Sequence, residues 1–221
     1  YYIMKKTTGI LTATVAAVAF TLASGVSAPS SAGAQMVEGP KVTWRASLWG
    51  KRGAFTESWE VLKSETAKRT GGNFDLKLYY GEQLSKSKEN LDGISVGAFD
   101  AAMVCQSYHP GKTPSANVLD LPFLPITNFD VQYEVVKTVF EHPRVAADFA
   151  KWNAIIFAIN MLPQYEYMGK GKPPLTVADF KGKRLRALGG MGRSAKKIGA
   201  VPTTVPASET YNALARGTVD A

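Results

Sequence analysis

The chain has very few of the side chains that bind metals or form covalent links. It contains one cysteine, Cys105, so no internal disulfide can form. Its two histidines, His109 and His142, lie far apart and each precedes a proline. Structural zinc takes four grouped Cys or His ligands, and a thiol nucleophile needs a base that a third residue orients. We therefore expect no metal and no cysteine chemistry, and stability must come from a hydrophobic core.

Long basic runs are also absent. The 221 residues include 26 Lys and Arg against 18 Asp and Glu, a formal net charge of +8, but these charges are spread along the chain. A nucleic-acid-binding protein usually gathers them on one face, so we expect no nucleic-acid partner. A hydrophobic content of 45% with 20% charged residues is typical of a globular protein.

No apolar run is long enough for a membrane span, which needs about 20 residues. The longest run, "ILTATVAAVAFTLA" at residues 10–23, follows Lys5 and Lys6 and precedes the small residues around Ala34. This order is typical of a secretory signal peptide. We therefore predict that residues 1–34 are a cleaved signal peptide and that the mature protein is exported.

The first part of the mature chain alternates between two periodicities. Residues 41–49 place apolar side chains at every second position, which predicts a strand, and residues 54–70 place them at helical spacing before a glycine stop. Strands are also predicted at 74–80 and 99–105, with a short helix around Leu91 and Ile94 between them. Strands that alternate with helices in this order predict a parallel sheet covered by helices.

A proline-rich connection at 106–127 precedes two predicted helices and a buried strand. The helices are expected at 129–142, capped by Asn128, and at 144–153, and the strand at 154–162. We expect Val131, Val135 and Val139 to mark the core face of the first of these helices.

A second alternating series follows. It predicts strands at 184–188 and 201–206, helices at 194–199 and 208–217, and the start of a further strand at Val219. The fold class is therefore α/β, with two lobes and a cleft between them. We assign the first lobe to residues 35–158 and the second to residues 159–221. We expect the second lobe to be incomplete, because the sequence ends where a further strand is predicted to begin.

The segment "KGKRLRALGGMG" at 181–192 combines a basic strand with glycines. Gly190 and Gly192 fit G-x-G-x-x-A, and Glu209 lies 19 residues after Gly190, which is the pattern of a dinucleotide site. An NAD(P)-dependent oxidoreductase is thus one alternative. However, the acidic residue falls in a predicted helix rather than at a strand end, and a glycine turn that joins a strand to a helix explains the same residues.

The arginines of this strand have different expected positions. Alternation places Arg184 and Arg186 on the face opposite Leu185, with Arg186 nearer the carboxyl end of the strand. Ligands of open α/β sheets bind outside the carboxyl ends of the strands, and an arginine can hold a carboxylate by two parallel hydrogen bonds. We expect Arg186 to face the cleft and Arg184 to be a solvated charge, while a salt bridge to a neighbouring acid remains the alternative for Arg186.

Aromatic and polar residues follow the other predicted strands. Trp49 follows the first strand, Cys105, Gln106 and Tyr108 follow the third, and Tyr165 follows the strand that ends the first lobe. Such a mixture suits a small organic anion.

Four segments resemble the periplasmic solute-binding proteins of tripartite ATP-independent periplasmic (TRAP) transporters, the dicarboxylate-binding DctP type. They are "YYGEQLSKSKENLDGISVGAFDAAM" (79–103), "LDLPFLP" (119–125), "LTVADFKGKRLRALGG" (175–190) and "IGAVPTTVPASETYNALARGTVDA" (198–221). The resemblance implies two lobes that close on a carboxylate without chemistry or cofactor, and delivery of that solute to a membrane permease. It also implies a monomer.

The resemblance further implies that Arg186 binds the carboxylate. The other cleft positions that it implies are Ser47, Trp49, Cys105, Gln106, Tyr165, Glu166, Leu188, Gly189, Ala207 and Glu209.

The chain departs from the family pattern in two places. Glu166 stands where some sialic-acid-binding members have a second arginine, which argues against a sugar acid, and the sequence ends about a hundred residues before the pattern does. A carboxylate-sensing domain of a receptor is a further alternative, because transport and sensing use the same cleft.

Overall fold

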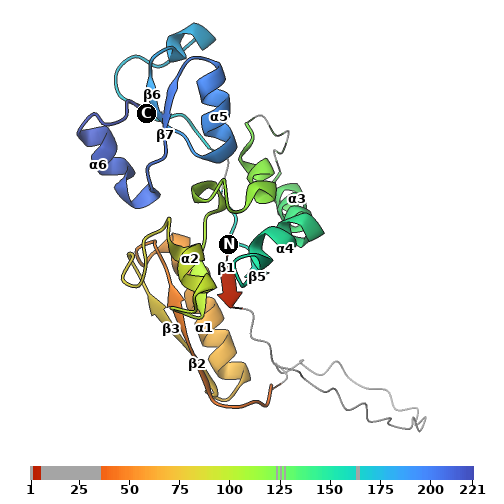
Figure 1. The fold of residues 1–221 in the computed structure, drawn as a ribbon. Coiled ribbons are helices and arrows are strands. Elements are labelled where there is room, and N and C mark those ends of the chain that lie inside the picture. The colour runs from red at the N-terminus through yellow and green to blue at the C-terminus, as the bar shows by residue number, and fades with distance from the viewer. Residues whose placement is uncertain (1, 6–35, 123, 125, 127, 163–164) are drawn as a thin grey trace, which may run out of the picture.

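The computed structural model describes residues 2–5, 36–122, 124, 126, 128–162 and 165–221. The strands form two sheets, one of five strands in the order β3-β2-β4-β1-β5 and one of two strands, β6-β7. The second sheet and its helices lie at one end of the molecule, and the first sheet with α1 and α2 lies at the other (Figure 1). Within these described ranges, no helix is both long and apolar enough to span a bilayer. The two sheets and the helices that connect their strands confirm the predicted α/β class.

Three parallel strands form one side of the first sheet. β2 (Val42–Ser47) lies between β3 (Phe74–Tyr79) and β4 (Ala101–Met103) and is parallel to both. The chain passes through α1 (Glu57–Arg69) between β2 and β3, and through α2 (Asn90–Ser95) between β3 and β4. The predicted alternation of strands and helices is confirmed here.

The strand β1 (Tyr2–Lys5) completes this sheet in an unpredicted way. It lies between β4 and β5 (Ala154–Ala158) and is antiparallel to both, with Met4 opposite Ala101 and Ile155. The first sheet is mixed through β1, which lies within the predicted signal peptide, whereas β2, β3 and β4 of the predicted mature chain are parallel as predicted. Residues 1 and 6–34 of the predicted signal peptide lie outside the described residues, and that assignment stays a prediction.

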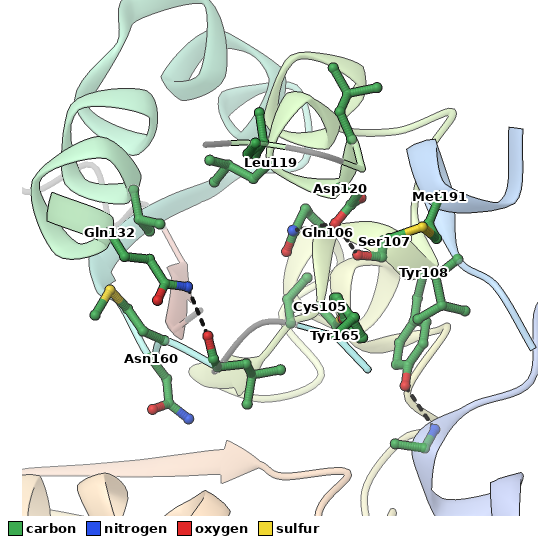
Figure 2. A pocket seen from close by; sticks show the side chains of 18 of the residues that line it. Cys105, Gln106, Ser107, Tyr108, Leu119, Asp120, Gln132, Asn160, Tyr165 and Met191 are labelled. Carbon is green, nitrogen blue, oxygen red and sulfur yellow. Dashed lines mark hydrogen bonds between the residues drawn. The ribbon is translucent and has the colours of Figure 1, made fainter. Parts of the chain in front are cut away.

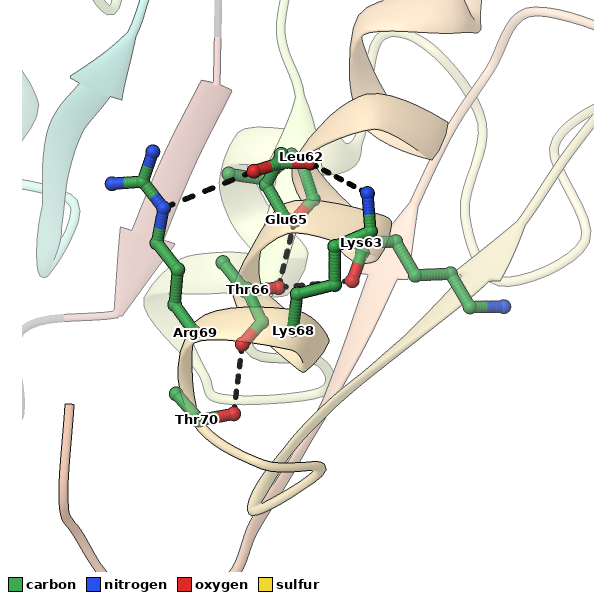
Figure 3. Close-up of polar contacts among 7 residues, drawn as sticks. All are labelled: Leu62, Lys63, Glu65, Thr66, Lys68, Arg69 and Thr70. Carbon is green, nitrogen blue, oxygen red and sulfur yellow. Dashed lines mark hydrogen bonds and ion pairs between the residues drawn. The ribbon is translucent and has the colours of Figure 1, made fainter. Parts of the chain in front are cut away.

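The helix α1 carries charges on its exposed face. Glu65 pairs with Lys68 at 3.0 Å and with Arg69 at 3.9 Å, one helical turn away (Figure 3). Exposed pairs of this kind each contribute about 0.3 to 0.5 kcal/mol. Gly71 follows the helix with a φ of 58°, a conformation that glycine adopts without steric cost, so the predicted glycine stop is confirmed.

The connection after β4 contains two 3-10 segments, η2 (Gln106–Tyr108) and η3 (Pro114–Asp120). After it, α3 (Phe129–Glu141) begins at the predicted cap, where the Asn128 side chain accepts from the backbone N–H groups of Asp130 and Val131. The predicted core face of α3 is confirmed only in part. Val139 packs against the core beside the buried Val136 and Phe140, whereas Val131 is 52% exposed.

This error has a simple cause. Four valines lie in α3, and the sequence alone does not tell which members of a four-residue repeat face the core. The next helix, α4 (Pro143–Ala150), lies at the second predicted helix and buries Val145 and Phe149.

The second sheet is short. β6 (Arg184–Arg186) and β7 (Val201–Thr203) are parallel, and α5 (Gly189–Lys197) connects them, followed by α6 (Thr210–Ala215). The C-terminal residues extend along β6, because Asp220 N–H donates to the Arg184 carbonyl and Arg186 N–H donates to the Ala221 carbonyl. The predicted lobe boundary at 158/159 coincides with the end of β5 and stays a prediction.

The helix α5 begins five residues before its predicted start, because the glycines of the predicted turn form its first turn. A Cβ on Gly192 would lie 2.7 Å from the Ala187 carbonyl oxygen, and one on Gly190 would lie 3.0 Å from the Asp120 carbonyl oxygen. These two glycines therefore let the helix pack closely against neighbouring backbone.

Two hydrophobic clusters cover the first sheet. One contains Leu91, Phe99 and Phe149, and the other contains Leu48, Trp59 and Leu76. Leu188, from the segment that follows β6, also packs into the second cluster. The second sheet has a smaller cluster of its own. Leu188 thus joins the second alternating series to the core of the first.

The buried imidazole of His109 makes stability dependent on pH. The side chain is 3% exposed, and burial, aided by the nearby charge of Lys112, lowers its pKa to about 4 from 6.5. As the pH falls from 6.5 to 4, unfolding takes up a proton, so the free energy of unfolding decreases.

We expect His109→Gln to remove this dependence. From pH 7 to pH 5 the wild type should lose about 1 to 2 kcal/mol more stability than the variant. Urea denaturation at both pH values measures the difference. An equal loss in both proteins would contradict the assignment.

Candidate functional site

A cavity of about 620 Å³ lies between segments of the two alternating series. Its wall is formed by the carboxyl end of β4, by η2 and η3, by α3, by the segment after β5, and by β6 with the start of α5. Figure 2 shows side chains from these elements surrounding one open space. Segments from both alternating series therefore build the cavity. Ligand sites in α/β proteins commonly lie at the carboxyl ends of strands, as this cavity does.

Arg186 brings a positive charge to this wall. Its Nε donates to the Val205 carbonyl oxygen at 2.9 Å and its Nη2 to the Tyr108 hydroxyl at 3.3 Å. Both acceptors are neutral, and no carboxylate in the described ranges pairs with this guanidinium. A partly buried, uncompensated guanidinium is a strong site for an anion.

Arg184, two residues earlier, is different. Its guanidinium donates two hydrogen bonds to the Asp220 carboxylate, and nearly half of its side chain is exposed. This contact lowers the pKa of Asp220 to about 2. The salt bridge that the sequence left open for Arg186 therefore belongs to Arg184.

Tyr108 connects the two parts of the wall. Its hydroxyl accepts from the Ala207 backbone N–H at 2.8 Å (Figure 2). It also accepts from Arg186. Burial raises its pKa to about 12, so the phenol stays protonated near neutral pH. Because it accepts both bonds, its own hydrogen remains available to a ligand. Lys88 makes a second connection, from its Nζ to the Thr204 carbonyl at 2.9 Å.

A buried polar cluster lies beside Tyr108. Oδ1 of Asp120 accepts from the Ser107 hydroxyl at 2.6 Å and from the Gln106 Nε2 at 3.0 Å. Burial raises the pKa of Asp120, and the two hydrogen bonds oppose that shift. The second oxygen of Asp120 has no hydrogen-bond partner among the described residues.

The cavity wall includes seven of the residues that the sequence placed in the cleft. They are Trp49, Cys105, Gln106, Tyr165, Arg186, Leu188 and Ala207. Whether each contacts a ligand stays a prediction.

Four of the expected cleft residues lie outside the wall. Ser47 is fully buried and donates its hydroxyl to the Asn90 side chain at 2.8 Å. Glu166 and Glu209 are exposed. Gly189 begins α5 and faces Asp120 rather than the cavity. Their sequence positions next to strand ends did not distinguish a cleft position from the positions on either side of it.

Several wall residues were not expected from the sequence. Tyr108 was noted only as a strand-end residue, and Asp120 lies within the quoted segment "LDLPFLP". Gln132 and Asn160 also line the cavity and donate to the carbonyls of Leu162 and Phe55. No local pattern marks these residues, because α3 and the segment after β5 reach the cavity only through tertiary packing.

The described residues contain no group of three or more His, Cys, Asp or Glu side chains that could hold a metal ion. The wall instead contains the Arg186 guanidinium, the Asp120 carboxyl group, neutral hydrogen-bonding groups and apolar surface. Such a site can bind and orient a small anion.

The family model DctP, described as bacterial extracellular solute-binding protein, family 7, matches residues 46–221. A monocarboxylate 2-oxoacid-binding periplasmic protein of Nostoc sp. is 27% identical over 82% of this chain and 50% of its own length. The C4-dicarboxylate-binding periplasmic protein of Rhodobacter capsulatus is 28% identical over 69% of this chain and 46% of its own length. The chain spans about half the length of the curated relatives it matches.

Solved structures show the same fold. A TRAP transporter solute-binding protein from Bordetella bronchiseptica, with copurified calcium and picolinate, has a TM-score of 0.72 at 23% identity, over 82% of this chain and 55% of its own. One from Sulfitobacter sp. with bound galacturonate has a TM-score of 0.69 at 17% identity, over 81% and 60%.

Gly189, the first residue of α5, lies close to Asp120 of η3, and this contact generates a prediction about stability. Its φ is 45°, and a Cβ there would lie 2.4 Å from the Asp120 Oδ2 and 2.8 Å from the Asn117 Oδ1. Gly182 has a φ of 75° but nothing within 4 Å of its Cβ position. The two alanine variants therefore share backbone strain and differ in the clash.

We expect Gly182→Ala to lower the free energy of unfolding by about 1 kcal/mol. Gly189→Ala should lower it by about 1 to 3 kcal/mol more, because overpacking adds to the strain. Urea denaturation of both variants measures this difference. Equal values would show that α5 moves away from Asp120 at no cost.

Proposed function

The chain belongs to the DctP family of bacterial extracellular solute-binding proteins, family 7, and we propose that it captures a small organic carboxylate for a TRAP-type membrane permease. The family binds solutes and is not enzymatic. The proposed mechanism is closure of two lobes around the anion, without a chemical step.

The observation that carries this proposal is the charge of Arg186 on the cavity wall. Its guanidinium donates only to neutral oxygens within the described ranges, and it lies beside the protonated hydroxyl of Tyr108. A carboxylate would supply the missing negative charge and accept from both groups. A neutral solute would leave the guanidinium uncompensated, at a cost that a charged ligand avoids.

The printed names of the relatives support the same ligand class. The two curated relatives described above bind 2-oxoacids and C4-dicarboxylates, and the two structures hold picolinate and galacturonate. Each of these ligands contains a carboxylate. This common group favours a carboxylate for the present chain, and no relative decides which one.

The connections across the cavity support the proposed closure of two lobes. Tyr108 comes from the connection after β4, whereas Arg186 and Ala207 come from the second alternating series. A ligand that contacts both Arg186 and Tyr108 would hold the two lobes together. We propose that these contacts couple ligand binding to lobe closure, in a monomeric periplasmic protein that a signal peptide exports.

The oxidoreductase alternative is wrong. The family is not enzymatic, and Gly190 and Gly192 have a structural explanation. Both are buried, and each lies so close to a backbone carbonyl oxygen that a Cβ would force the neighbouring backbone to shift. The glycines that resemble a dinucleotide fingerprint therefore permit helix packing.

Arg186→Ala tests the proposal. The purified protein is screened by thermal shift with succinate, malate, pyruvate, lactate and pyroglutamate, and calorimetry then measures the affinity for each acid that binds. Loss of the guanidinium should weaken binding by thirtyfold to several thousandfold, because about 2 to 5 kcal/mol is typical when one partner of a desolvated charge pair is removed.

Arg184→Ala is the matched control on the same strand. Its charge is already paired with Asp220 outside the cavity wall, so the affinity should change by less than about threefold. The proposed anchor would be wrong if both variants bound the acid as well as the wild type.

A further inference from the structure

The turn before α2 contacts the second alternating series at a point outside the cavity. The Lys88 Nζ donates to the Thr204 carbonyl oxygen at 2.9 Å, across 116 residues of chain. Lys88 is exposed and lies outside the cavity wall. A ligand in the cavity would therefore not touch this side chain, and any effect of Lys88 on binding must act through the arrangement of the two predicted lobes.

The turn that carries Lys88 is held against the first sheet. Ser87, on one side of the lysine, is buried. Asn90, on the other side, is also buried, and its amide accepts from the Ser47 hydroxyl at 2.8 Å and donates to the Met103 carbonyl at 2.9 Å. These two partners are the last residues of β2 and β4. The lysine thus projects from a fixed point at the carboxyl ends of the strands.

The segment that accepts this bond, residues 204–207, also holds the proposed ligand anchor. The Val205 carbonyl oxygen accepts from the Arg186 Nε at 2.9 Å. The Ala207 N–H donates to the Tyr108 hydroxyl at 2.8 Å (Figure 2). The lysine and the phenol of the first lobe therefore hold the same four residues, and those residues hold the guanidinium of the anchor.

The bond between Lys88 and Thr204 depends on the two lobes being together. A hydrogen bond is lost once its donor and acceptor separate beyond about 3.5 Å, so even a small opening of the lobes breaks it. A contact that is made in the closed form alone favours that form and adds to the affinity of every ligand that requires closure. It also slows release of the ligand, because opening must break it.

We propose that Lys88 holds the closed form of the protein and thereby sets the rate of ligand release. It is a positioning residue that acts through residues 204–207 and not through the ligand. Its effect is consequently the same for every acid that the cavity accepts. This inference rests on the proposed function and deepens it, because it names a residue outside the cavity that controls closure.

Lys88→Met removes the charged donor and keeps the length of the side chain. Trp49 lines the cavity, so stopped-flow tryptophan fluorescence can follow binding and release of succinate, malate, pyruvate, lactate or pyroglutamate, whichever bind. Release should become about three- to tenfold faster, which is the range expected for the loss of one hydrogen bond, while association changes by less than about twofold. The affinity should fall by the same factor for each acid, and factors that differ between acids would contradict the proposal.

Lys86→Met is the matched control in the same turn. The Lys86 Nζ lies 3.8 Å from the Glu82 carboxylate, within the first lobe. Both variants lose one positive charge from the same turn, so a general effect of charge on anion binding would appear in both. Only Lys88→Met should release its ligand faster, and equal release rates in the two variants would overturn the assignment.

Lys88→Arg and ligand-free stability separate control of release from a purely structural role. The arginine keeps a charged donor, so its release rate should stay within about threefold of the wild type. Urea denaturation without ligand should give Lys88→Met the same midpoint as Lys86→Met, because both side chains are exposed. A lower midpoint for Lys88→Met alone, or failure of that variant to fold, would assign Lys88 to folding and overturn the proposal.

The failure of this inference is distinguishable from failure of the proposed function. If Arg186→Ala loses the acid and Lys88→Met releases it at the wild-type rate, carboxylate capture stands and the role of Lys88 does not. If no acid binds to the wild type, or if Arg186→Ala binds each acid as the wild type does, the proposed function fails and the inference fails with it.

Discussion

The uncompensated charge of Arg186 is the constraint on which the rest of the site depends. A guanidinium that is partly removed from water needs either a carboxylate partner or good neutral acceptors. Val205 and Tyr108 supply two such acceptors and fix its position. Because Tyr108 also binds the Ala207 N–H, the same hydroxyl joins the connection after β4 to the segment before α6. The Tyr108 hydroxyl therefore both binds the charged group of Arg186 and connects the two alternating series.

Asp120 organises a neighbouring part of the wall in a comparable way. It is a buried carboxylate whose described hydrogen bonds come from Ser107 and Gln106 rather than from a cation. It also lies against the glycines that begin α5, where a side chain on Gly189 would collide with it. One residue thus holds the side chains of Gln106 and Ser107 and limits how closely the second series packs on the first.

The role of the glycines near Arg186 is decided by how they pack in the fold. In sequence they fit a dinucleotide fingerprint, and their spacing alone does not exclude one. In the fold, the constraint on Gly190 and Gly192 is the short distance to backbone carbonyls, while Gly189 adopts a positive φ at the helix start. Three neighbouring glycines therefore answer two different steric requirements, and neither involves a phosphate.

Local sequence patterns determined several helix and strand positions in this protein. The alternation along residues 42–47, the glycine stop after α1, the Asn128 cap and the place of Arg186 toward the end of its strand all follow from neighbouring residues, whose geometry is set by the backbone itself. Only the tertiary structure decided which face of α3 is buried, that Arg184 rather than Arg186 pairs with Asp220, and that Tyr108 reaches Arg186 across 78 residues of chain. These depend on how elements distant in sequence pack together, and that packing leaves no periodic signal in the residues themselves.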